Sequence, residues 1–259
     1  MAGGNWSDLG PRAISAIVMS GVGLFAIWMG GWIFAVLVAG ATGLIVWEIT
    51  NMLAPEGGIH EGPGVIGAMA GIAVLLASGA PQLAAVLIVL AAALLGLLML
   101  GHGAKDGGRF VLYTAWVMIA GYGLITLRAQ GGVSVIFWLV LVVIATDTAG
   151  YFAGKTFGGK KFWPAVSPKK TWSGTIAGWG AAAIVGLFFG GFGLMLISAL
   201  LAFASQMGDA AESALKRYTG IKDSSNLIPG HGGVFDRFDA LMGASLVMTL
   251  AALLGWAGL

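Results

Sequence analysis

The sequence predicts an all-α integral membrane protein, a polytopic bundle of about nine transmembrane helices. Hydrophobic residues make up 58% of the 259 residues and charged residues only 9%, whereas ordinary soluble domains are about 25% charged. The apolar run over residues 13–53 is long enough for two spans of roughly 20 residues each. Because no charged residue follows Arg12 before Glu48, we expect an uncleaved anchor here rather than a secretory signal.

The apolar runs place the individual helices in order along the chain. We expect helices at residues 13–29, 32–53, 63–79, 81–101, 109–128, 133–157, 171–190, 193–218 and 234–257. On this division all seven prolines fall at helix ends or in loops, as expected because an interior proline removes a helix hydrogen bond. The 44 glycines favour close contacts between helices, since small residues let membrane helices approach one another.

The basic residues predict how this bundle is oriented. With a cytoplasmic N-terminus, 12 of the 13 Lys and Arg residues lie at the cytoplasmic face, and only Arg128 lies on the other side. The C-terminus is then expected on the side opposite to the cytoplasm. We find no repeat of fixed period and no soluble segment, so we expect one membrane domain over residues 1–259.

The chain contains no cysteine. This absence excludes disulfides, thiolate nucleophiles and cysteine–zinc sites. Any metal ion would therefore be bound by oxygen or by one of the three histidines, which favours a hard cation such as Mg2+.

Polar residues gather in three clusters, and the first is the stretch ATDTAGYFAGKTFGGKK. Asp147, Tyr151 and Lys155 follow at four-residue steps and so line one face of a helix. A carboxylate at membrane depth is costly unless it is paired or hydrated. The cluster predicts either a buried Asp that fixes helix packing or the wall of a polar cavity, with Lys155, Lys160 and Lys161 at its mouth.

The second cluster is SPKKTWSG, residues 167–174. Ser167 and Thr171 offer hydroxyl groups, and Lys169 and Lys170 offer positive charge just before a helix begins. A helix N-terminus beside lysines can bind a phosphate group. A short basic loop can equally be a determinant of orientation or a contact to lipid headgroups.

The third cluster begins with SQMGDAAESALKR, residues 205–217. Glu212 and Lys216 are spaced to form an ion pair along the helix. Asp209 has only Ser205 and Ser213 four residues away on either side, and neither is a counter-charge. Asp209 is therefore a candidate for binding a ligand.

The stretch GIKDSSNLIPGHGGVFDRFDA, residues 220–240, completes this cluster. Its Gly/Pro-rich loop can bring the backbone close to a ligand. Asp236 and Asp239 follow in the first turns of the last helix, where acids also complement the helix dipole. Asp209 and Asp236, surrounded by Lys and Arg, predict a Mg2+–polyphosphate site in which carboxylates hold the cation and basic groups neutralise phosphate.

These residues resemble the CDP-diacylglycerol synthase family, also called phosphatidate cytidylyltransferase. The family pattern of Ser-x-x-Lys-Arg, Lys-Asp, Pro-Gly-His-Gly-Gly and Asp-Arg-x-Asp is filled at every fixed position of SALKRYTGIKDSSNLIPGHGGVFDRFD, Ser213 to Asp239. GDAAES, DTAGYFAGKTFGGK and SPKKTWSG also resemble family blocks, so that the match spans about residues 146–240. At Ser173 related sequences often have Glu or Gln, and no role is carried over to that position.

The resemblance implies transfer of CMP from CTP to phosphatidate, with release of pyrophosphate, at the cytoplasmic face. By matching position, Asp209 and Asp236 would hold divalent cations, expected to be Mg2+, and Lys216, Lys222 and His231 would join them in catalysis. The residues implied in substrate binding are Asp147, Lys155, Ser167, Lys170, Thr171, Ser213, Arg217, Asp223, Gly232, Gly233, Arg237 and Asp239. Residues 1–130 would be mainly scaffold helices, and residues 131–259 would supply catalytic helices and cytoplasmic loops.

The expected partners are CTP, phosphatidate and membrane lipids, with no nucleic acid, and the resemblance suggests a homodimer. The expected location is a bacterial-type inner membrane. Two other classes remain open from the residues alone. The protein could be an ion-coupled transporter in which ions are relayed by Asp147, Asp209 and Glu212. Transporters of this kind are expected to have inverted repeats and broken helices. The protein could also be an enzyme with another substrate, namely a lipid kinase or a cytidylyltransferase with a polyprenol or glycerolipid acceptor.

Overall fold

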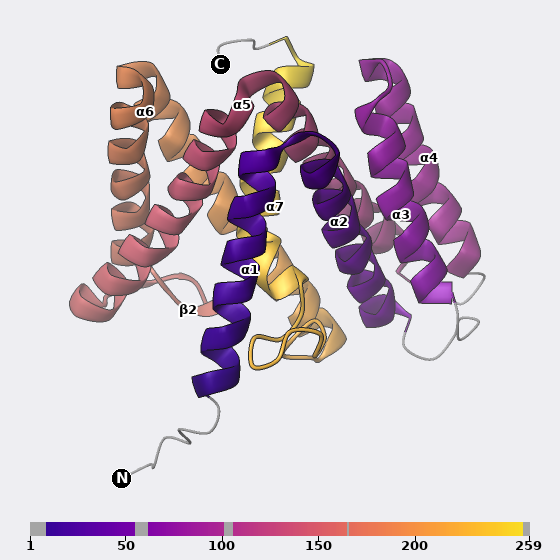
Figure 1. Ribbon diagram of the computed structural model, residues 1–259. Helices are drawn as coiled ribbons and strands as arrows, with labels where there is room; N and C mark the ends of the chain where they lie inside the picture. The colour runs from indigo at the N-terminus through magenta and orange to yellow at the C-terminus, as the bar shows by residue number, and fades with distance from the viewer. Residues whose placement is uncertain (1–8, 55–61, 101–105, 165, 256–259) are drawn as a thin grey trace. The chain divides into compact units, whose positions relative to one another are not determined.

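The computed structural model describes residues 9–54, 62–100, 106–164 and 166–255, which are almost entirely helical. The helices are α1 (Leu9–Met29), α2 (Gly31–Leu53), α3 (Gly62–Ser78), α4 (Gln82–Leu100), α5 (Gly107–Phe157), α6 (Trp172–Thr219) and α7 (Phe235–Leu253) (Figure 1). α5 and α6 each cover two of the predicted helices, and the helix ends lie close to the predicted positions. Residues 101 and 256–257, at the ends of two predicted helices, lie outside the described residues.

The two longest helices are each bent at glycine. α5 has 51 residues and is interrupted at Gly132, where φ is 75° and ψ is −164°. α6 has 48 residues and is interrupted at Gly190 and Gly191, and the latter has φ 70°. A positive φ is a conformation that glycine adopts readily and other residues rarely do. The predicted breaks after residues 128 and 190 are therefore present as glycine kinks.

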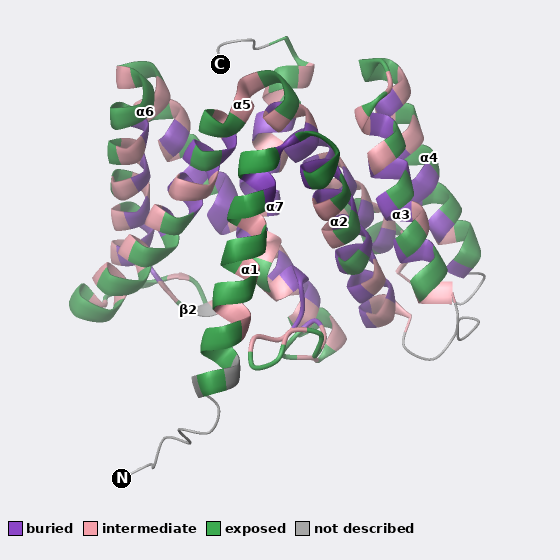
Figure 2. Ribbon diagram, viewed as in Figure 1, coloured by how far each residue is buried: buried purple, intermediate pink, exposed green. Residues whose placement is uncertain are grey.

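Five helices of the described part are long and apolar enough to cross a membrane, namely α1, α2, α4, α5 and α6. Large apolar side chains also remain on the exposed surface, where Figure 2 shows green faces along α1 and α6. Trp28 on α1 is 70% exposed and Phe188 on α6 is 85% exposed. Exposed apolar surface on this scale is typical of helices that face lipid. The predicted class, an all-α membrane protein, is confirmed.

The chain forms two compact units, and the first consists of Met1–Met118 and Ile221–Arg237. Its helices α2 and α3 pack through glycines, since a Cβ atom added to Gly67 would lie 2.6 Å from the carbonyl oxygen of Gly43. A Cβ on Gly71 would lie 2.8 Å from the carbonyl oxygen of Ala39. Small residues thus set the separation of these two helices, as is common in membranes.

The second unit consists of Ile119–Gly220 and Phe238–Leu259. The two arms of α6 fold against each other, and the indole Nε1 of Trp179 donates to Oε1 of Gln206 at 3.0 Å. The second arm of α5 is joined to α6 by Trp138, whose Nε1 donates to Oγ of Ser198 at 2.9 Å. Ser245 on α7 donates to the carbonyl oxygen of Ala120 on α5 at 2.7 Å. These hydrogen bonds connect the elements that carry the polar residues of this unit.

Two short antiparallel strands, β1 (Lys161–Trp163) and β2 (Ser167–Thr171), connect α5 to α6. A short basic loop was expected over residues 167–170 of this stretch. β1 has only three residues, and β2, with the sequence SPKKT, has no alternation of polar and apolar residues. Neither segment therefore shows the pattern that predicts a strand. The hairpin leads directly into α6 and fixes the position of Lys170.

Candidate functional site

Polar residues of the second unit meet in a group of three carboxylates, Asp209, Glu212 and Asp239, which we call the acidic cluster. One ligand atom from each lies within 4.8 Å of the others. Asp209 and Glu212 come from the second arm of α6, and Asp239 comes from α7. Three carboxylates at this separation offer oxygen ligands suited to a hard divalent cation.

Two glycines bring the helices of the acidic cluster together. A Cβ atom on Gly208 would overlap the carbonyl oxygen of Asp239, and one on Gly243 would lie 2.9 Å from the Cα of Gly208. The backbones of α6 and α7 therefore touch at this crossing. Because Asp209 follows Gly208 directly, the crossing places its carboxylate beside that of Asp239.

Two lysines neutralise part of the charge of the acidic cluster. Nζ of Lys170 is in ion-pair contact with Asp209, and Nζ of Lys216 lies 2.6 Å from Oε1 of Glu212. Asp147 on α5 interacts electrostatically with Asp209 and Lys170. Together the group holds four carboxylates and two ammonium groups, so the charge that remains is negative and favours a cation.

Lys170 is held at the acidic cluster by the start of α6. The neighbouring Thr171 is the N-cap of that helix, and its Oγ1 accepts a hydrogen bond from the Gly174 N–H at 3.2 Å. Ser173 donates to the carbonyl oxygen of Gly158 at 2.5 Å. A Cβ on Gly150 would lie 3.3 Å from the carbonyl oxygen of Gly174, so α5 and α6 are in close contact here. The hydroxyls of Thr171 and Ser173 are thus used in fixing the fold.

The first unit contains the second polar group, residues 221–237, which we call the signature loop. Oδ2 of Asp236 accepts three hydrogen bonds at 2.8 Å, from the N–H and Oγ of Ser224 and from the N–H of Gly233. Gly232 has φ 84°, and its carbonyl oxygen accepts from the Ile228 N–H at 2.8 Å. The loop is therefore closed on itself around Asp236.

The cationic residues of the signature loop lie at its surface. Nε of Arg237 donates to the carbonyl oxygen of His231 at 2.9 Å, and Nδ1 of His231 lies 2.8 Å from Oγ of Ser15 on α1. Lys222 and Asp223 are exposed. These groups are available to a soluble ligand, whereas Asp236 is partly buried.

The structure brings together only some of the residues that the sequence predicted for the site. Asp147, Lys170, Asp209, Lys216 and Asp239 gather in the second unit around the acidic cluster. Further residues of that unit lie on α5, β2 and α6, namely Lys155, Ser167, Thr171, Ser213 and Arg217. The predicted residues of the first unit are Lys222, Asp223, His231, Gly232, Gly233, Asp236 and Arg237.

The predicted contacts of Glu212, Lys155 and Asp209 can be compared with the structure one by one. The ion pair expected between Glu212 and Lys216 is confirmed. Nζ of Lys155 lies 5.6 Å from the ring centroid of Tyr151, as expected for residues on one helical face. Asp209 and Asp236 belong to different units, so their pairing stays a prediction.

Glu48 is a buried carboxylate that was not among the predicted site residues. This carboxylate lies in the apolar helix α2, has no exposed surface and contacts the signature loop. The signal was present, because an isolated carboxylate within an apolar helix is costly and marks a polar partner elsewhere in the chain. The sequence does not say which segment provides that partner.

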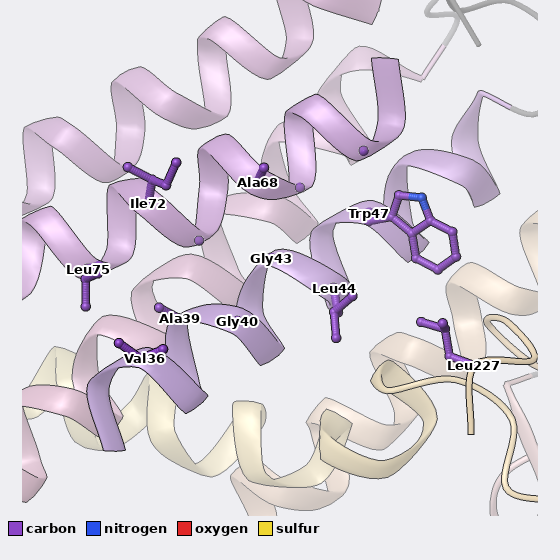
Figure 3. A pocket seen from close by; sticks show the side chains of 13 residues that line it. Val36, Ala39, Gly40, Gly43, Leu44, Trp47, Ala68, Ile72, Leu75 and Leu227 are labelled. Atoms are coloured by element: carbon purple, nitrogen blue, oxygen red, sulfur yellow. The ribbon is translucent and has the colours of Figure 1, made fainter. Parts of the chain in front are cut away.

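An apolar groove of about 580 Å3 runs between α2 and α3 (Figure 3). Glycines and small side chains form its floor, and Trp47 and Leu227 lie toward one end. Leu227 belongs to the signature loop, so the groove reaches that loop. Its lining suits apolar material rather than a charged ligand.

Comparison with known proteins defines the family. The model of the cytidylyltransferase family matches residues 11–254. The chain belongs to this family and is thus a nucleotidyltransferase. It is 35% identical to the phosphatidate cytidylyltransferase of Brucella suis, over 94% of this chain and 93% of that protein. The protein of the same name from Pseudomonas aeruginosa is 34% identical over 95% and 97% of the two chains, and that from Staphylococcus haemolyticus is 32% identical over 89% and 94%.

Proposed function

We propose that this protein transfers CMP from CTP to phosphatidate, forming CDP-diacylglycerol and pyrophosphate. The observation that carries the proposal is the match to proteins named phosphatidate cytidylyltransferase over nearly the full length of both chains. The match includes the acidic cluster and the signature loop, which contain the charged groups that a phosphoryl-type transfer needs.

In this reaction a phosphate oxygen of phosphatidate attacks the α-phosphorus of CTP. A new P–O bond forms, the bond from the α-phosphorus to the oxygen bridging to the β-phosphate breaks, and pyrophosphate leaves with that electron pair. The attacking phosphate is already an anion, so no side chain has to remove a proton from it. Positioning and electrostatic stabilisation are then the main contributions of the protein.

The basic residues of both polar groups would bind the phosphates. Lys170 and Lys216 are ion-paired with carboxylates of the acidic cluster, and a bound polyphosphate would compete for their ammonium groups. Arg217, Lys222 and Arg237 are exposed and can reach a soluble nucleotide. His231 would contact the nucleotide or its phosphates from the Gly-rich part of the signature loop.

We assign metal binding to Asp209 and Asp236, with Mg2+ as the expected ion. The donor set fits this ion, because Glu212 and Asp239 add carboxylate oxygens close to Asp209 and no thiolate is present in the chain. Bound Mg2+ would neutralise phosphate charge and polarise the α-phosphate. Asp209 and Asp236 would hold the divalent cations, with Glu212 and Asp239 as further oxygen donors beside Asp209, and Lys170 and Lys216 would orient the phosphates.

The membrane arrangement of the proposal has nine spans with a cytoplasmic N-terminus and the C-terminus on the other side. The two arms of α5 and of α6 each count as separate spans, since roughly 20 residues suffice to cross the hydrocarbon core. The active site then faces the cytoplasm of a bacterial-type inner membrane, where CTP is present. The chain would form a single membrane domain, and two copies of it would form a homodimer.

Pyrophosphate release by the purified protein tests the function. The protein would be assayed in mixed micelles with CTP and Mg2+, with and without phosphatidate. Release that requires both the lipid and the metal, together with a CDP-lipid product, supports the proposal. Release with a different lipid phosphate would change the assigned acceptor. No release with any lipid acceptor, from folded protein, would contradict the proposal and favour an ion transporter.

A further inference from the structure

Glu48 connects α2 to a segment more than 170 residues further along the chain. Four hydrogen-bond donor atoms of other residues lie within 3.0 Å of its carboxylate oxygens. Oε1 accepts from Oγ of Ser225 at 2.6 Å and from the Val234 N–H at 2.8 Å. Oε2 accepts from the Phe235 N–H at 2.7 Å and lies 3.0 Å from Oγ of Ser224. An ionised carboxylate buried in this way is costly unless all of its oxygens are satisfied, and here they are.

The contacts of Glu48 complete the start of α7. The first N–H groups of a helix have no partner within the helix, and a side chain just before it usually supplies an acceptor. Val234 holds that place before Phe235 and has no acceptor in its side chain. Glu48 supplies the acceptor from α2, and its negative charge also complements the positive end of the helix dipole.

Ser224 extends the contact of Glu48 to Asp236. Its Oγ lies between the two carboxylates, 3.0 Å from Oε2 of Glu48 and 2.8 Å from Oδ2 of Asp236. The N–H of Ser224 also donates to Oδ2 of Asp236 at 2.8 Å. A Cβ atom on Gly233 would overlap both Oγ of Ser224 and Oε1 of Glu48. The packing around Glu48 therefore leaves little freedom to the signature loop.

We propose that Glu48 is a positioning residue for the signature loop, which it holds in place through the start of α7 and through Ser224 and Asp236. This inference rests on the proposed function, in which the loop binds the phosphates of CTP and Asp236 binds metal. Glu48 itself touches no substrate. Loss of the Glu48 carboxylate would displace the residues of the signature loop that bind CTP. The KM for CTP would therefore change.

The informative substitution is Glu48→Gln, which keeps the size of the side chain. Gln has one acceptor oxygen and one NH2 group, so in either orientation the NH2 group faces the N–H of Val234 or of Phe235. Two N–H donors then face each other in a buried position, and neither has an acceptor. The free-energy cost of these unsatisfied donors should lower binding or catalysis by about 10- to 100-fold. Thr50→Val is the matched control, because Thr50 is buried on the same helix and its hydroxyl donates to the Val46 carbonyl oxygen of that helix at 2.7 Å.

Two measurements on the full-length protein in mixed micelles test the proposal. Steady-state kinetics should show a KM for CTP at least about tenfold higher in Glu48→Gln, and an unchanged KM in Thr50→Val. Hydrogen exchange should show faster exchange of the Val234 and Phe235 amides in Glu48→Gln alone. A purely structural defect would lower the amount of active enzyme and leave KM unchanged.

The outcomes separate this inference from the proposed function. Wild-type protein that releases no pyrophosphate would contradict the proposed function before any variant is compared. Wild-type activity with an unchanged KM for CTP in Glu48→Gln would overturn the positioning role alone, whether or not the two amides exchange faster. If Glu48→Gln does not fold, Ser225→Ala removes a single donor to Oε1, and its exchange rates and KM decide in the same way.

Discussion

Nζ of Lys216 lies 2.6 Å from Oε1 of Glu212, one helical turn earlier on α6, and the Glu212 side chain is only 1% exposed. Glu212 belongs to the acidic cluster. The ammonium group of Lys216 therefore stabilises the buried Glu212 carboxylate and also lies beside the proposed phosphate site. Breaking a buried pair from one side leaves an uncompensated charge.

Lys216→Met should therefore lower both stability and activity. We expect a loss of about 3 kcal/mol in the free energy of unfolding, measured by chemical denaturation in detergent. The double variant Glu212→Leu/Lys216→Met removes both charges and should regain most of that stability. It should remain inactive, because Lys216 is needed for phosphate binding. Recovered activity in the double variant would show that Lys216 acts only as a counter-charge.

Asp209→Asn and Asp236→Asn should each abolish turnover in folded protein. Loss of a metal ligand removes several kcal/mol of charge stabilisation, so we expect kcat to fall by at least about 100-fold. In Asp236→Asn the amide oxygen can still accept the three hydrogen bonds made to Oδ2, so the loop should keep its fold. Near-normal turnover in either variant would contradict the metal assignment for that residue.

Gly243→Ala should separate α6 from α7 and so disrupt the acidic cluster. A Cβ atom there would overlap the carbonyl oxygen of Ala204 and approach Gly208, and backbone atoms cannot move aside cheaply. We expect activity to fall by more than about tenfold, from a shift of over 1.4 kcal/mol in the barrier.

Gly180→Ala is the matched control for this crossing, since nothing lies within 4 Å of its added Cβ. It should leave activity unchanged and stabilise α6 by about 0.5–1 kcal/mol, because alanine favours a helix interior over glycine. Equal loss of activity in both variants would mean that the close crossing is not what positions Asp209 and Asp239.

Thr171→Ala should lower stability through loss of the N-cap of α6. The expected change is about 1 kcal/mol in the free energy of unfolding, while Thr171→Ser keeps the acceptor oxygen and should match the wild type. If Thr171 instead binds substrate directly, as the sequence implied, Thr171→Ala should raise KM for CTP or phosphatidate without a change in stability. Kinetics and denaturation of the same two variants distinguish these roles.

The sequence predicted the helical segments well because each is an apolar run bounded by glycine, proline or charge. Even the kinks at Gly132 and Gly191 coincide with predicted breaks. The β-hairpin that contains Lys170 was not predicted, since β1 has only three residues and β2 has no alternation of polar and apolar residues.

The candidate site was harder to predict because it depends on which helix faces meet. Asp239 lies close to Asp209 and Glu212, and periodicity alone does not show that these faces of α6 and α7 meet. That outcome depends on the contact of Gly208 with Gly243. Glu48 was missed for a related reason, since its partners are 176 to 187 positions away in the chain.

The distance in sequence between Glu48 and Phe235 also has a consequence for biosynthesis. Chains fold from the N-terminus as they are made, so α2 enters the membrane long before α7 leaves the ribosome. Until then the Glu48 carboxylate lacks the hydrogen-bond donors that offset the cost of its burial. Water or another part of the chain must donate hydrogen bonds to it in the meantime. The arrival of the last helix satisfies this carboxylate and completes the start of α7 in the same step. Assembly of the signature loop is thus tied to completion of the whole chain, and a chain that stops before α7 has no means of forming it.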